Sequence, residues 1–235
     1  MRFHASLPRR KNCFLALFLH TGKMLVAYWL VGKAFTGHVR TDSKPFYVHQ
    51  SRPLADIIRL VNKHSNNVMT RQLLLTLGAE IKGAPGTVEK GRQAIQEWLN
   101  QQNIRNEHLV IDNGSGLSRD SKVTAVTLLD LLKHAWYSPF MPELVSSMSI
   151  LGIDGTAKKR FRNQTLQGSM HIKTGVIDHV RAMAGIFHGN NGKRYIVISL
   201  HNHPGIHNGQ GTLIQNALLE WLDTKLEAQY QVSHR

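Results

Sequence analysis

The chain has 235 residues, 42% of them hydrophobic, which is enough to bury the core of one sizeable domain and excludes a disordered chain. Lysine and arginine total 29 against 15 aspartate and glutamate, so the net charge of +14 favours an anionic partner such as nucleic acid, an acidic membrane surface or a cell-wall polymer. The basic residues are scattered along the chain and only 7% of residues are aromatic, which argues against specific nucleic-acid binding. The single cysteine, Cys13, excludes an internal disulfide and a cysteine-based metal site.

The first 33 residues have the outline of an export signal, because a basic stretch at 9–11 precedes apolar runs at 13–19 and 24–31. His20 and Lys23 interrupt the apolar sequence, and no small-x-small cleavage site follows. A membrane helix needs about twenty apolar residues without a break. A working signal or anchor and a mis-started or vestigial leader therefore both stay open.

We assign residues 1–47 to a separate N-terminal segment and begin the domain at residue 48, since residues 1–47 show neither helical nor strand periodicity that continues into a neighbour. Apolar residues at helical spacing predict three helices, beginning at Pro53, at about Asn67 and at Thr87. The second of these helices is expected to stop at Gly78. After them the sequence predicts a short strand at 108–111, a glycine-rich turn at 112–117 and a helix around 125–132.

The later part of the chain changes character. Strand-like segments are predicted at 168–174, 181–187 and 195–200, with the hairpin turn Asn190-Asn191-Gly192 between the last two. A final amphipathic helix at 213–222 has an apolar face to cover this antiparallel unit, and 229–235 is expected to be a tail. The fold class is therefore α+β, with helices plus an antiparallel sheet covered by a C-terminal helix.

Two short patterns could carry chemistry: Ser65-Asn66-Asn67 between two helices, and Lys173-Thr174-Gly175 at the end of a strand. Each alone has an ordinary structural reading, as helix-capping residues and as a strand end with a turn glycine. Together they match the second and third elements of the serine acyl-transfer enzymes that recognise penicillin, which use Ser-x-x-Lys, Ser-x-Asn and Lys-Thr-Gly.

With these motifs the sequence resembles the low-molecular-mass penicillin-binding proteins, a family of serine D-alanyl-D-alanine carboxypeptidases and endopeptidases. The resemblance runs from Leu54 to Trp221, about the C-terminal half of a family member, and implies a partial transpeptidase-like (beta-lactamase-like) fold over 48–228. Besides the two motifs, three landmarks carry it: the turn at 112–119, Gly152-Ile153-Asp154-Gly155-Thr156 with the basic tract after it, and the segment at 180–185.

The resemblance implies a role for each motif residue. Lys173 and the Thr174 hydroxyl would bind the free carboxylate of a stem peptide ending in D-Ala-D-Ala. Ser65 would pass a proton to the leaving D-alanine, and the Asn67 amide would hold the substrate's backbone amide. Gly175 would belong to the substrate-binding strand.

Two departures from the family pattern stand out. Val176 occupies a position where the family usually has a small hydroxyl residue, although its backbone N–H could still supply half of an oxyanion hole. No serine has a lysine three residues later, so the Ser-x-x-Lys motif is missing. The most similar sequences have the pattern Thr-x-x-Lys and begin at Thr41, Thr87 and Thr156. The sequence therefore predicts a truncated carboxypeptidase that is inactive alone, with a catalytically dead peptidoglycan-binding or structural remnant as the alternative and a basic nucleic-acid binder as a third reading.

The histidines suggest a further possibility, because His201, His203 and His207 cluster in one loop with His188 in the preceding strand. No paired carboxylates flank them, so no metal and no cofactor is expected. The resemblance implies beta-lactams as possible ligands and a periplasmic or cell-envelope location, and it leaves membrane association open.

Overall fold

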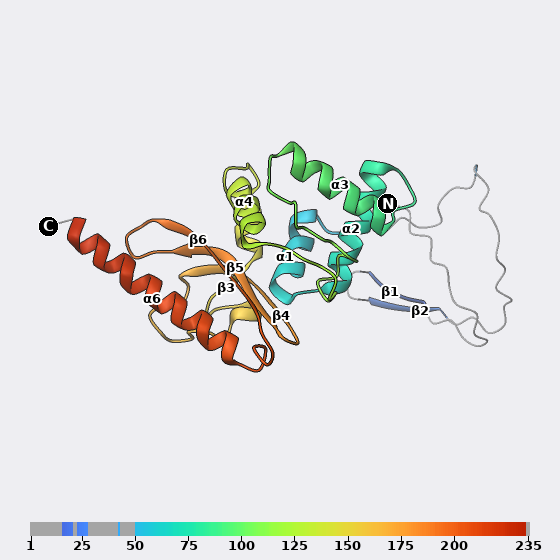
Figure 1. Cartoon of the computed structure of the whole chain (residues 1–235). Coiled ribbons are helices and arrows are strands. Elements are labelled where there is room, and N and C mark those ends of the chain that lie inside the picture. Colours follow the sequence, from blue (N-terminus) through green and yellow to red (C-terminus); the bar gives the residue numbers. More distant parts are fainter. Residues whose placement is uncertain (1–15, 21–22, 28–41, 43–49, 234–235) are drawn as a thin grey trace. The chain divides into compact units, whose positions relative to one another are not determined.

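The computed structural model describes residues 16–20, 23–27, 42 and 50–233, which fall into two compact units, 1–50 and 51–235 (Figure 1). In the first unit, β1 (Ala16–His20) pairs antiparallel with β2 (Lys23–Ala27). The sequence showed no strand periodicity here that continues into a neighbour, but two short apolar runs separated by two residues suffice for a hairpin. The other residues of the predicted leader lie outside the described part. No helix in that part is long and apolar enough to cross a membrane.

The second unit begins with helices whose starts follow their capping residues. Asn66 accepts a hydrogen bond from the Met69 N–H at the start of α2, and Thr87 accepts one from the Lys90 N–H at the start of α3. The helices are α1 (Leu54–His64), α2 (Asn67–Lys82), α3 (Val88–Gln101), α4 (Ala125–Trp136) and α5 (Met141–Ser147).

Gly78 lies inside α2 and does not end it, contrary to the sequence-based expectation. A Cβ at this position would lie 2.8 Å from the Gly91 nitrogen and 2.9 Å from the Thr87 carbonyl oxygen. The glycine therefore allows α2 and α3 to pack closely instead of stopping a helix.

The sheet has four antiparallel strands in the order β3-β4-β5-β6. Its elements are β3 (Ser149–Ile150), β4 (Met170–Ile177), β5 (Val180–His188) and β6 (Arg194–Asn202), followed by α6 (Gln210–Ser233). The segment 108–111 forms only an isolated bridge from Val110 to Lys122 and not the expected strand. α6 continues into the stretch expected to be a tail.

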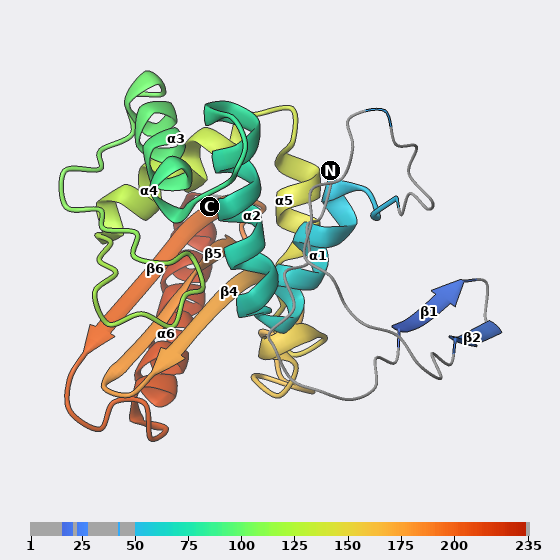
Figure 2. The ribbon, with the colours of Figure 1, turned by 90° about the vertical axis from the view of Figure 1, so that its right-hand side faces the viewer.

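The sheet separates two layers of helices (Figures 1 and 2). α6 runs along one face, where Phe187, Met170, Ile172 and Leu219 are fully or almost fully buried in the main hydrophobic core. The helices that precede the sheet in sequence lie on its other side, with α4 against β6. The predicted α+β architecture, an antiparallel sheet covered by a C-terminal helix, is confirmed.

Candidate active site

Ser65 lies at the junction of α1 and α2. It is the C-cap of α1 and has a φ of 54°, in the left-handed region that non-glycine residues seldom adopt. Its backbone N–H donates to the Val61 carbonyl, which holds this conformation. A left-handed residue commonly ends a helix, and here it turns the chain from α1 into α2.

Lys173 meets Ser65 across 108 residues of sequence. Its Nζ donates to Ser65 Oγ at 2.5 Å and to the carbonyl oxygen of Thr174 at 3.1 Å. Burial lowers the pKa of Lys173 from its usual range. The residue is in the interior of β4, which extends three residues past the predicted strand end at 174. The two motifs predicted from sequence are therefore joined by a direct hydrogen bond.

Asn67, the first residue of α2, is held against the glycine-rich turn. Its Nδ2 donates to the Ser115 carbonyl at 2.5 Å, and a Cβ on Gly116 would lie only 3.6 Å from the same nitrogen. Arg92 from α3 donates to the Asp112 carbonyl at the start of the turn. These contacts fix the turn beside the N-terminus of α2.

Thr174 contacts a residue to which sequence reasoning gave no role. Its Oγ1 lies 2.8 Å from Thr156 Oγ1, and the Thr156 N–H donates to Ser149 Oγ at 3.1 Å. A Cβ on Gly155 would lie 2.2 Å from Ser149 Oγ, so only glycine fits beside Thr156. Thr156 belongs to the Gly152–Thr156 landmark that the sequence analysis had identified. Only the fold shows that this threonine contacts and orients the Thr174 hydroxyl.

An ion pair ties this loop to the helix that carries Ser65. Lys63 Nζ lies 2.5 Å from Asp154 Oδ2, and Asp154 Oδ1 accepts the Ile150 N–H at 2.7 Å. Burial raises the pKa of Asp154, but the hydrogen bonds from Ile150 and Lys63 more than offset this, so the pKa lies below its usual range. The pair anchors the end of α1 next to β3 and β4.

We expect Asp154→Asn to destabilise the chain at pH 7 by less than about 1 kcal/mol, because the carboxylate is partly exposed. A depressed carboxyl pKa stabilises the fold above the unfolded value of about 3.9, and this contribution is lost as the pH falls through the lower folded value. The difference in urea midpoint between wild type and variant should therefore shrink below pH ~4. Asp120→Asn, an exposed carboxylate outside the ion pairs above, is the control. The same pH dependence in both variants would contradict the prediction.

Gly175 and Val176 border a groove of about 730 Å³ at the far end of β4. The Val176 side chain is 54% exposed there. Arg119 from the opposite wall donates to the Asp178 carbonyl at 2.6 Å and forms an ion pair with its carboxylate. The structure thus places the predicted substrate-binding residues along one strand, from Lys173 beside Ser65 to Val176 in the groove.

The histidines do not assemble as a single cluster. β5 and β6 are antiparallel, so His188 pairs with Arg194 at one end of the hairpin while His201 pairs with Arg181 at the other. His207 instead accepts a hydrogen bond from the His179 N–H at 2.9 Å and lies 3.7 Å from Asp178. Among the described residues no group of three or more histidine, cysteine or acidic residues could hold a metal ion.

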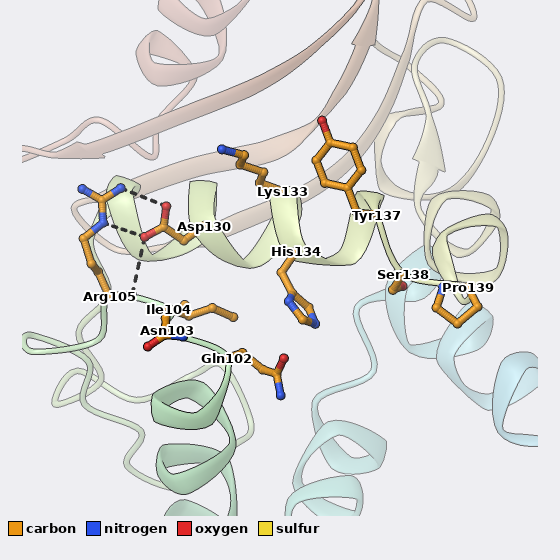
Figure 3. Close-up of a pocket in the computed structure, with 10 residues that line it drawn as sticks. All are labelled: Gln102, Asn103, Ile104, Arg105, Asp130, Lys133, His134, Tyr137, Ser138 and Pro139. Carbon is orange, nitrogen blue, oxygen red and sulfur yellow. Dashed lines mark hydrogen bonds and ion pairs between the residues drawn. The ribbon is translucent and has the colours of Figure 1, made fainter.

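A second hollow, of about 680 Å³, contains none of the motif residues (Figure 3). Arg105 and Asp130 form an exposed ion pair on its wall, with the Nε to Oδ2 distance at 2.6 Å. Such surface pairs contribute little to stability. Because no motif residue lines this hollow, it is separate from the site that the motifs build.

Comparison with known proteins decides the family. The model of the D-Ala-D-Ala carboxypeptidase 3 (S13) family matches residues 29–225, beginning upstream of Leu54, where the motif resemblance starts. This chain belongs to the S13 family. Its relatives include a D-alanyl-D-alanine carboxypeptidase of Actinomadura sp. strain R39, which is 32% identical over 169 residues, 70% of this chain and 31% of the relative. DacB of Haemophilus influenzae is 27% identical over 179 residues, 73% of this chain and 37% of the relative.

Solved structures give the same fold. The crystal structure of Haemophilus influenzae penicillin binding protein 4 matches with a TM-score of 0.64 at 23% identity, over 74% of this chain and 41% of that one. A complex of the same protein with a novel beta-lactam matches with a TM-score of 0.61 at 25% identity, over 66% of this chain and 36% of that one. The S13 chain described here spans about a third of the length of the curated relatives that it matches.

Proposed function

We propose that this chain carries the substrate-binding part of a serine-type D-alanyl-D-alanine carboxypeptidase site and that the 235 residues alone form no acyl-enzyme. The observation that carries the first part is the hydrogen bond from Lys173 Nζ to Ser65 Oγ, which joins the two family motifs. The second part rests on the sequence, because no serine has a lysine three residues later.

In this proposal β4 binds the end of a peptidoglycan stem peptide. Lys173 and the Thr174 hydroxyl receive the terminal carboxylate, and Thr156 orients that hydroxyl through the contact at 2.8 Å. Gly175 and Val176 offer main-chain groups at the exposed end of the strand, where a peptide can pair with it. The Val176 N–H would donate to the carbonyl oxygen of the scissile bond.

Ser65 and Asn67 act on the other side of the peptide. A hydroxyl that accepts a hydrogen bond from a lysine with a lowered pKa can pass a proton to the leaving D-alanine and recover it from the lysine. Asn67, held by Ser115, is placed to orient the substrate's backbone amide. A beta-lactam would use the same groups, and a cell-envelope location follows from the proposed substrate.

Binding of an acetylated L-Lys-D-Ala-D-Ala peptide, followed by NMR or calorimetry, tests the substrate-binding part. We expect Lys173→Met to weaken binding by about tenfold to a hundredfold, the loss that removal of one charge-assisted hydrogen bond produces. Lys193→Met, which removes the same charge from an exposed position, should bind like wild type.

Two results would contradict the substrate-binding part. One is equal affinity in Lys173→Met and wild type. The other is equal affinity of the wild-type chain for the same peptide ending in L-Ala-L-Ala. A folded wild-type chain that binds neither peptide would favour the alternative of a structural remnant, whose support is the missing Ser-x-x-Lys sequence.

A further inference from the structure

A buried arginine lies on the α6 side of the sheet, apart from the hydrogen bond between Ser65 and Lys173. Arg160 is only 8% exposed. Its Nε and Nη2 donate to Asn216 Oδ1 at 3.0 and 2.6 Å, and Nη1 donates to Gln215 Oε1 at 3.4 Å. All of these acceptors are neutral amide oxygens on α6. The guanidinium charge is therefore bound by dipoles and has no counter-ion in this set.

A second arginine reaches the same part of α6. Arg181 belongs to β5, and a Cβ on Gly211 of α6 would lie 2.7 Å from its Cβ and Cγ, so its side chain leaves the sheet toward α6. Burial and the charge of Arg181 together lower the pKa of Arg160 to about 10. Burial also lowers the pKa of Arg181 itself. Two positively charged side chains therefore pack against neighbouring turns of α6, Arg181 at Gly211 and Arg160 at Gln215 and Asn216.

Two donors in this region lack a partner among the described residues: the Nε of Arg181 and the Nε2 of Gln215. Gln215 is fully buried and lies one helical turn after Gly211, on the same face of α6. No described carboxylate forms an ion pair with Arg160 or Arg181. Buried cations and buried donors without acceptors are both unfavourable, and a single anion would satisfy both.

We propose that Arg160, Arg181 and Gln215 form a binding site for one small oxyanion beneath the first two turns of α6. The guanidinium groups match the oxygen geometry of phosphate-like anions, and the N-terminal end of the helix adds positive potential. The site lies on the opposite side of the sheet from Ser65. A bound anion would fasten α6 to β5 at the end of the sheet where β4 and β5 turn.

Inorganic phosphate is the probe. At constant ionic strength in Tris–chloride, we expect the melting temperature of the full 235-residue chain to rise saturably with phosphate. Equilibrium dialysis should give one phosphate per chain. Arg181→Met should shift the phosphate midpoint upward by about tenfold or more, since it removes charge-assisted hydrogen bonds. Without phosphate the variant should melt no lower than wild type, because an uncompensated buried charge has been removed.

Arg194→Met is the matched control, since Arg194 is exposed near the other end of the β5–β6 pair and its loss changes the net charge equally. It should keep the wild-type phosphate midpoint. The proposal is overturned if dialysis finds no stoichiometric phosphate on the wild-type chain, which would leave water as the partner of the two donors. It is overturned equally if Arg181→Met and Arg194→Met respond to phosphate alike.

Discussion

The 235-residue chain should show no covalent label after incubation with a fluorescent penicillin and denaturing electrophoresis. Acylation needs an activated nucleophile, and none of the serines is followed by lysine at the third position. Ser65 is hydrogen-bonded to Lys173 and is proposed as a proton carrier. A penicillin-recognising enzyme that carries the Ser-x-x-Lys sequence is the positive control.

A labelled band on a chain that melts cooperatively would contradict the proposal of inactivity. Its origin could then be assigned with two variants, Ser65→Ala and Ser138→Ala, the second altering a hydroxyl in the hollow of Figure 3. Loss of label only in Ser65→Ala would make Ser65 the nucleophile and would replace its proposed role in proton transfer. Loss in neither variant would exclude both Ser65 and Ser138 as the labelled residue.

The largest effect on stability is expected from Gly185→Ala in β5. A Cβ at Gly185 would lie 2.0 Å from the His171 carbonyl oxygen and 2.9 Å from the Ile172 Cα. Both are backbone atoms of β4, so the clash can be relieved only by moving one strand away from the other. We expect the free energy of unfolding, measured with urea, to fall by about 3 kcal/mol or more.

Gly175→Ala is the stability control for this prediction, because the nearest heavy atom to its Cβ would be the Cβ of Ala182 at an ordinary 3.5 Å. Its free energy of unfolding should stay within about 1 kcal/mol of wild type. Similar midpoints for the two variants would show that β4 and β5 can separate easily. That result would also weaken the site argument, since Lys173 is positioned by this strand pair.

Local sequence signals predicted the elements well where one residue decided a boundary. Asn66 and Thr87 begin helices because their side chains accept the otherwise unpaired N–H groups of the first turn. Gly78 was misread, because a helix-stop glycine and a helix-packing glycine look alike until the neighbouring helix is present. The short segment at 108–111 was misread as a strand because it finds only one bridging partner.

By itself the sequence determined the family, the α+β class and the residue types of the proposed site, since motifs, caps and alternating apolar residues are local patterns. Only the tertiary structure decided which groups meet. Lys63 reaches Asp154 and Thr156 reaches Thr174, while antiparallel pairing places His188 far from His201. The burial of Arg160 under α6 likewise depends on how helix and sheet pack. Contacts between distant residues follow from strand register and packing, which no local pattern encodes.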